Sequence, residues 1–217
     1  MIRVLGALVA LVGVLGAGVA RADSQVWTRA GIVADVMGDV EVAVEQRTRF
    51  DASGIRLQGL LPQATIAYQP MWALELGAGY RFSYQRGRND DMEFRHRYHV
   101  DAQARHDLRD LRLRYRLRLQ ERYRSRDGRL PTLRNRVGAG WRGLDPWVPR
   151  VTFSTFTRLG DDGERFQFHK WRLSARLRYD LSDQSIAGFY RLERSISRPE
   201  DPLLHILGLA YTYELDL

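Results

Sequence analysis

The chain has 217 residues and a formal charge of +8, with no cysteine and, in Lys170, a single lysine, so arginine carries nearly all of its positive charge. The absence of cysteine excludes disulfide bonds and a lipoprotein attachment site. An excess of positive charge of this size favours anionic partners without identifying them.

The first 22 residues have the pattern of a secretory signal peptide. Arg3 supplies a positive start, residues 4–19 are apolar and uncharged, and Ala20-Arg21-Ala22 is a small-x-small cleavage site. We expect residues 1–22 to be removed, which lowers the formal charge to +6 because Arg3 and Arg21 leave. An uncleaved anchor is the alternative, but the apolar run is short for a membrane span of about 20 residues.

The rest of the chain, residues 23–217, is expected to form one domain, since no Pro- or Ser-rich linker divides it. It contains no apolar run long enough for a membrane-spanning helix. Instead, segments that alternate between apolar and polar residues end in clusters of Gly, Asp, Asn, Ser or Pro, which is the pattern of β-strands. About eleven segments follow this pattern, near 25–36, 40–50, 55–68, 72–84, 94–106, 111–124, 132–143, 148–158, 165–181, 185–197 and 204–217.

The segment 111–124, LRLRYRLRLQERYR, shows the alternation most clearly. One face is built from Leu and Tyr, with Glu121 as its one polar residue, and the other from arginines and Gln120. Helical spacing would distribute these charges around the whole cylinder and leave no apolar stripe to bury. We therefore expect a strand whose apolar face meets lipid and whose arginines point into a barrel.

The main structural alternative is a soluble β-sandwich, whose strands usually have about five or six residues. The segments here have a dozen or more, whereas a tilted strand that crosses a bilayer needs about 9–11 and must belong to a closed barrel. Short links near 69–71, 107–110, 144–147 and 182–184 also alternate with longer ones at 85–93, 125–131, 159–164 and 198–203, as in outer-membrane barrels. The predicted fold class is an all-β, transmembrane, antiparallel up-and-down β-barrel of about 10–12 strands.

The number of segments disagrees with the usual strand number of such barrels. Bacterial barrels have even strand numbers, so we expect ten or twelve strands rather than eleven. Either one segment is miscounted, or segment 25–36 does something unusual such as entering the lumen.

Short stretches along the chain carry a resemblance: Gln25-Val26-Trp27-Thr28, Glu45-Gln46-Arg47, Gly79-Tyr80-Arg81, Arg118-Leu119-Gln120-Glu121-Arg122, Arg134-Asn135-Arg136, Tyr190-Arg191 and Ile206-Leu207-Gly208-Leu209. They resemble the bacterial domain-of-unknown-function 2490 family. The resemblance implies an outer-membrane barrel and supplies no catalytic residue.

The candidate site is the inward face of the barrel. Its arginines are expected to form the lumen or an anion path: Arg112, Arg114, Arg116, Arg118, Arg122, Arg134, Arg136, Arg172, Arg176, Arg178 and Arg191. Other inward arginines are expected at 47, 49, 81, 95, 97 and 105, and the expected inward acids are fewer: Glu41, Glu45, Glu75, Asp101, Asp180, Glu193 and Glu214. Two hypotheses stay open, a narrow passive channel for small anionic solutes and a barrel plugged by ion pairs that acts as a structural or surface-interaction protein.

Other functions have weaker support in the sequence. A lipid hydrolase would need one of His96, His99, His106, His169 or His205 beside a nucleophile, and no such arrangement is evident, so we do not expect an enzyme. His96 and His99 would face opposite sides of a strand, and we expect no metal and no cofactor. The expected location is the bacterial outer membrane, and the expected partners are its lipids, the barrel-assembly machinery that reads the last strand, and small anions rather than nucleic acid.

Overall fold

The computed structural model describes residues 24–52, 56–87, 90–124, 128–160, 166–197 and 202–216. The expected signal peptide lies outside this part of the chain. Within it, every segment expected to alternate is a strand: β1 Ser24–Asp35, β2 Val40–Asp51, β3 Arg56–Met71, β4 Leu74–Arg86, β5 Met92–Leu108, β6 Leu111–Arg124, β7 Gly128–Trp141, β8 Trp147–Arg158, β9 Gln167–Leu181, β10 Gln184–Ser195 and β11 Leu204–Asp216.

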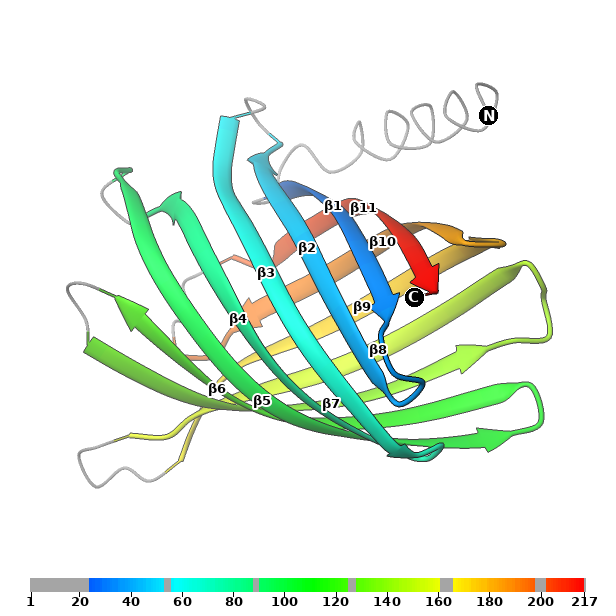
Figure 1. Ribbon diagram of the computed structural model, residues 1–217. Coiled ribbons are helices and arrows are strands. Elements are labelled where there is room, and N and C mark those ends of the chain that lie inside the picture. The colour runs from blue at the N-terminus through cyan, green and yellow to red at the C-terminus, as the bar shows by residue number, and fades with distance from the viewer. Residues whose placement is uncertain are drawn as a thin grey trace.

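The eleven strands form one closed barrel in which each strand pairs with its neighbours in the sequence (Figure 1). This confirms the predicted fold class of a transmembrane β-barrel. The expectation of ten or twelve strands was wrong. Segment 25–36 does not enter the lumen, because it is β1 and takes a full place in the wall between β2 and β11.

An odd strand number determines how the barrel closes. Ten of the strand pairs are antiparallel, but β1 and β11 run in the same direction and pair in parallel, from Ser24 opposite His205 to Asp35 opposite Asp216. An even number would have made the closing pair antiparallel as well. The start of β1 and the end of β11 therefore lie at opposite rims.

The two rims differ in the length of their links. One rim, here called the short-turn rim, carries the links 36–39, 72–73, 109–110, 142–146 and 182–183 together with the end of β11. The other, the long-link rim, carries the start of β1 and most of the longer links, including 87–91, 159–166 and 196–203. The expected link at 69–71 was misplaced, since β3 continues to Met71, which pairs with Leu74 after a register shift.

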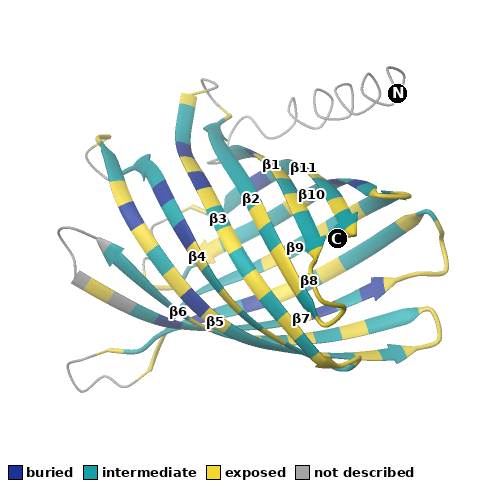
Figure 2. Ribbon diagram, viewed as in Figure 1, coloured by how far each residue is buried: buried dark blue, intermediate teal, exposed yellow. Residues whose placement is uncertain are grey.

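The outer surface of the barrel is an apolar belt. On β6, Leu113, Tyr115, Leu117 and Leu119 point outward and are 37–45% exposed, and their neighbours on β5 and β7 include the exposed Val100 and Val137. Figure 2 shows the corresponding alternation of exposed and less exposed residues along strands such as β3. So much contiguous exposed apolar surface is what a lipid-facing wall requires. Among the described residues, no helix is long and apolar enough to cross a membrane.

The inside of the barrel is polar, with a small apolar component. Arg81, Arg95, His99 and Ser154 are buried there. The buried apolar residues that face inward with them are few: Trp27, Leu61, Phe156, Ala187, Ile206 and Ala210. The usual arrangement of a globular protein is thus reversed, as the alternation predicted.

One interruption occurs in the wall between β3 and β4. The two strands pair at Leu60 opposite Tyr84 and again at Gln63 opposite Arg81, but Leu61 and Pro62 are skipped. The cause is chemical, because proline has no N–H to donate to the neighbouring strand. On the outside, Pro62 lines an apolar groove of about 450 Å³ together with Leu60, Phe82 and Phe94.

Candidate functional site

The barrel encloses a cavity of about 1630 Å³ lined mainly by polar side chains. It begins at the long-link rim, where Gln25 and Ser195 line it, and reaches as deep as Glu41 and Arg150. Eight of the predicted site residues line this cavity: Arg116, Arg118, Arg122, Arg134, Arg136, Arg172, Arg176 and Arg191. The structure therefore brings most of the predicted arginines together around one space.

The other three predicted residues lie closer to the short-turn rim and do not line the cavity. Arg112 and Arg114 are near the start of β6, and Arg178 is near the end of β9. Arg112 donates through Nε to Asp107 over 2.7 Å, and Arg178 donates through Nη2 to Asp180 over 2.8 Å. Ion pairs therefore occupy part of this end of the barrel.

Four cavity-lining arginines were not predicted from the sequence: Arg29 on β1, Arg86 at the end of β4, and Arg150 and Arg158 on β8. The signal that could have identified three of them was present in the alternation. Arg150 and Arg158 are each an even number of residues from Ser154, which faces the lumen, and Arg29 is two residues from Trp27. Extending the inward face along every strand, rather than along the most arginine-rich ones, would have found Arg29, Arg150 and Arg158. It would not have found Arg86, which is one residue out of phase with the inward Gln85.

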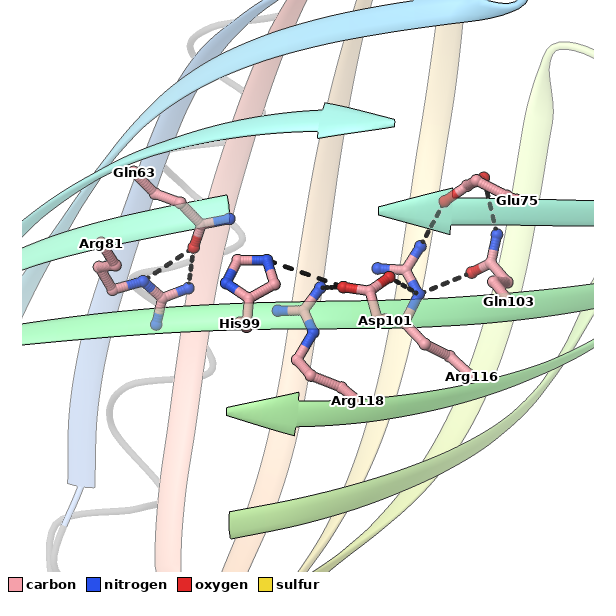
Figure 3. Close-up of polar contacts among 8 residues, drawn as sticks. All are labelled: Gln63, Glu75, Arg81, His99, Asp101, Gln103, Arg116 and Arg118. Carbon is pink, nitrogen blue, oxygen red and sulfur yellow. Dashed lines mark hydrogen bonds and ion pairs between the residues drawn. The ribbon is translucent and has the colours of Figure 1, made fainter. Parts of the chain in front are cut away.

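Asp101 on β5 organises one side of the lumen (Figure 3). Its carboxylate lies 2.7 Å from Arg118 Nη2, 3.5 Å from Arg116 Nε and 3.7 Å from His99 Nε2. The Asp101 and His99 side chains are almost completely buried, at 4% and 2% exposure. One acid therefore holds guanidinium groups from β6 against the β5 wall.

The same network continues toward β4 through Arg116. Arg116 Nη2 lies 3.0 Å from Glu75 Oε1, and its Nε donates to Gln103 Oε1 over 3.0 Å. Gln103 in turn donates through Nε2 to Glu75 over 3.0 Å. Figure 3 shows these contacts, with Arg81 and Gln63 forming a separate pair beyond His99. Arg116, Gln103 and Glu75 therefore satisfy one another on this side of the lumen.

Two further acids each hold a pair of cations. Glu45 on β2 binds Arg47 and lies 3.0 Å from Arg29 Nε. Glu193 on β10 binds Arg172 and accepts from Lys170 Nζ over 2.8 Å. Each acid neutralises one of its two cations, so these clusters stay net positive.

Many lumen arginines have no carboxylate partner at all within the described chain. They are Arg49, Arg81, Arg97, Arg105, Arg114, Arg134, Arg136, Arg150, Arg158, Arg176 and Arg191. The reason is visible in the sequence, because β7 and β8 contain no Asp or Glu. Most inward acids lie on β2, β4 and β5, with Asp180 on β9 and Glu193 on β10, so the wall of β7 to β9 carries more guanidinium groups than carboxylates.

Aromatic rings partly replace the missing acids near the long-link rim. Trp27 lies under two guanidinium groups, with Arg49 Cζ at 4.1 Å and Arg191 Cζ at 4.8 Å from its ring centroid. Phe156 similarly contacts three cations: Arg134, Lys170 and Arg172. Cation–π contacts of this kind stabilise arginine without neutralising its charge.

The histidines point to different sides of the barrel wall. His96 and His205 face lipid, where each ring Nδ1 shares a hydrogen bond with a tyrosine, Tyr80 at 2.7 Å and Tyr190 at 2.6 Å. His99 faces the lumen, so it points to the side of β5 opposite His96, as the strand periodicity predicted. Within the described ranges, no three His, Cys, Asp or Glu side chains are arranged to hold a metal ion.

Comparison with solved structures finds OmpT, an outer membrane protein of Vibrio cholerae. The in-vitro folded form has 8% sequence identity and a TM-score of 0.43 over 79% of this chain and 56% of that chain. The form expressed in the outer membrane has 7% identity and a TM-score of 0.41, over 77% of this chain and 60% of that chain. The chain thus spans less than two thirds of OmpT, and this likeness carries no functional information.

Sequence comparison gives a more definite result. No match is found among curated proteins. The model of a family described as "Protein of unknown function (DUF2490)" matches residues 24–203, which include all of β1 to β10. The chain therefore belongs to this family of unknown function.

Proposed function

We propose that the protein is a channel of the bacterial outer membrane through which small anionic solutes pass without an energy source. The observation that carries the proposal is the wall of β7 to β9, where guanidinium groups without carboxylate partners line a cavity of about 1630 Å³. Rings and rows of arginine in a pore favour anions and repel cations. A barrel of eleven strands lies between those filled by side chains, with about eight strands, and open porins with 16 to 18.

The proposed orientation follows from the two rims. Outer-membrane barrels place short turns in the periplasm and longer links outside. By this rule, the short-turn rim faces the periplasm, and the end of the cavity lined by Gln25 and Ser195 faces the exterior. The apolar belt would contact membrane lipids, and the barrel-assembly machinery would recognise β11, whose outward Leu207, Leu209 and Tyr211 form an apolar face.

A plugged barrel that serves a structural or surface-interaction role is the second candidate, and a specific observation favours it. Arg112, Arg114 and Arg178 do not line the cavity, and Arg112 and Arg178 are engaged in ion pairs near the short-turn rim. Arg142 also reaches Asp107 there, over 3.1 Å. This end would be the constriction of a channel or the closed end of a plug.

Neither candidate requires catalysis, and we propose that the protein is not an enzyme. No described serine hydroxyl hydrogen-bonds to a histidine, so the nucleophile and base of a lipid hydrolase are not paired. The cationic lumen needs no cofactor to attract anions.

The test is an electrical measurement on the refolded protein in a planar lipid bilayer. We expect discrete conductance steps in KCl and, in a KCl gradient, a reversal potential close to the chloride equilibrium potential. Arg136→Gln should reduce the anion selectivity, whereas Asn135→Gln, on the lipid-facing side of the same strand, should not. A folded barrel that passes no current would refute the channel and favour the plug, and a cation-selective current would refute the role of the arginines.

A further inference from the structure

Two arginines of the β8–β9 wall lie directly opposite each other. Arg150 on β8 pairs in register with Arg176 on β9, and the next inward rung pairs Thr152 with Ser174. All four side chains line the lumen cavity. Directly opposed residues have Cβ atoms about 4.5–5.5 Å apart, so the two arginine side chains leave the wall from adjacent positions.

This arrangement is costly in the empty barrel. Like charges directly across a strand pair are destabilising. Within the described chain, neither Arg150 nor Arg176 forms an ion pair or a side-chain hydrogen bond, and Arg176 Nε is buried without a partner. The one acid on β9, Asp180, is bound by Arg178 over 2.8 Å. Glu45 also interacts electrostatically with Arg176, but it forms its ion pairs with Arg29 and Arg47. The pair therefore lacks a carboxylate that is not already bound by another arginine.

The surroundings add donors and leave room. Arg191 donates through Nε to Ser174 Oγ over 3.1 Å, so the Ser174 hydroxyl accepts from Arg191 and its own proton remains to be donated. Thr152 supplies a second hydroxyl on the same rung. On β7, Gly140 lies opposite Arg150 and has no side chain of its own, and a Cβ there would be in van der Waals contact with Arg150 Nε at 3.5 Å.

We propose that Arg150, Arg176, Thr152 and Ser174 form a binding site for a compact tetrahedral oxyanion with two negative charges, such as a phosphate or sulfate group. Two charges on the ligand match the two guanidinium groups. Several oxygens can accept both planar arginine forks and the two hydroxyls at once. Chloride has one charge and cannot accept a two-pronged fork through separate atoms, so it binds more weakly.

The site adds a class of ligand to the proposed channel. It rests on the proposed function in one respect only, which is that anions must be able to reach the lumen. Binding in detergent is therefore the primary test, because it does not depend on conduction. We would titrate inorganic phosphate and sulfate into the refolded protein by isothermal calorimetry, with chloride and acetate as comparison anions. We expect saturable binding of both dianions at one site and at least tenfold weaker binding of chloride and acetate.

Variants separate this site from general positive charge. Arg150→Gln and Arg176→Gln should each weaken phosphate binding at least tenfold. Arg158→Gln is the matched control, since Arg158 also lines the cavity and lacks a carboxylate partner, but Thr132 and Gln167 oppose it rather than an arginine. Its affinity should stay within twofold of the wild-type value. Equal losses in all three variants, or equal affinity for chloride, would overturn the site.

Stability gives an independent measurement if folding is affected. Arg150→Gln removes a like-charge contact, so the empty variant should unfold at a higher urea concentration than the wild type, and phosphate should no longer raise that midpoint. A variant that is less stable without phosphate, or still stabilised by it, contradicts the proposal. Anion current without phosphate binding would refute the site and keep the channel, whereas phosphate binding without current would keep the site and refute the channel.

Discussion

The ring of Phe189 covers the backbone of Gly208, its direct partner across the β10–β11 pair. A Cβ at position 208 would lie 2.6 Å from Cε1 and from Cε2 of that ring, and closer still to Cζ. We expect Gly208→Val to destabilise the barrel by about 1–3 kcal/mol, because the added atoms force the ring out of its place. Urea titration of the protein folded into lipid vesicles would measure the loss.

Gly188 provides the control for this variant. It is the residue before Phe189, faces lipid, and has nothing within 4 Å of the position where a Cβ would be. Gly188→Val should therefore leave stability nearly unchanged, and Phe189→Ala should relieve much of the cost of Gly208→Val. Similar losses in Gly188→Val and Gly208→Val would show that glycine flexibility matters rather than the ring.

Leu117 tests the lipid-facing side of β6. Its side chain is 39% exposed on the outer surface, while Arg116 beside it lines the lumen. Leu117→Arg should cost about 2–4 kcal/mol of folding free energy in bilayers if the residue lies at mid-membrane depth. Leu117→Val is the control, and a cost below that of the valine variant would contradict the assigned facing.

Asp101 tests the ion-pair network of the lumen. Asp101→Asn leaves Arg116 and Arg118 without this buried counter-charge, and loss of one partner from a buried ion pair costs about 3–5 kcal/mol. Glu121→Gln is the comparison, because Glu121 faces outward and lies 3.8 Å from the exposed Arg129. Exposed pairs contribute about 0–1 kcal/mol. Equal midpoints for the two variants in urea would mean that Asp101 is not a structural centre.

Pro62 tests the interruption between β3 and β4. Pro62→Val supplies the missing N–H, which can donate to the carbonyl of Phe82 and complete the rung. We expect slower amide hydrogen exchange around residues 61–63 and 82–84, and a gain of about 0.5–1.5 kcal/mol. Leu60→Val, at a rung that is already formed, should change neither quantity. Unchanged exchange in Pro62→Val would show that another cause opens this seam.

Alternation of residue types determined most of what could be predicted. All eleven segments were identified because each side chain faces either lipid or lumen, and LRLRYRLRLQERYR leaves no other arrangement for its arginines. The expectation of ten or twelve strands was wrong because strand number depends on how β1 meets β11, a long-range contact that no local pattern records. The bounds of β3 were misjudged for a related reason, since Gln69-Pro70 has the composition of a turn but lies within the strand.

The sequence predicted which arginines face the lumen, but not which of them form ion pairs there. The sequence placed both Arg116 and Arg136 in the lumen. It could not show that Glu75 and Asp101 form ion pairs with Arg116, whereas Arg136 has no acid partner. That difference depends on which strands are neighbours and on their register. The opposition of Arg150 and Arg176 has the same origin, since it needs the β8–β9 register as well as the inward face.

The parallel closing pair also limits how the chain could be rearranged. In a barrel with an even number of strands, the two ends meet at one rim, and a few residues suffice to join them and open the chain elsewhere. Here residues 24 and 216 are at opposite rims, separated by the twelve-residue length of β1, roughly 40 Å along the strand. A circular permutant would need a connector that crosses the full height of the barrel, either through the lumen or along the lipid-facing wall.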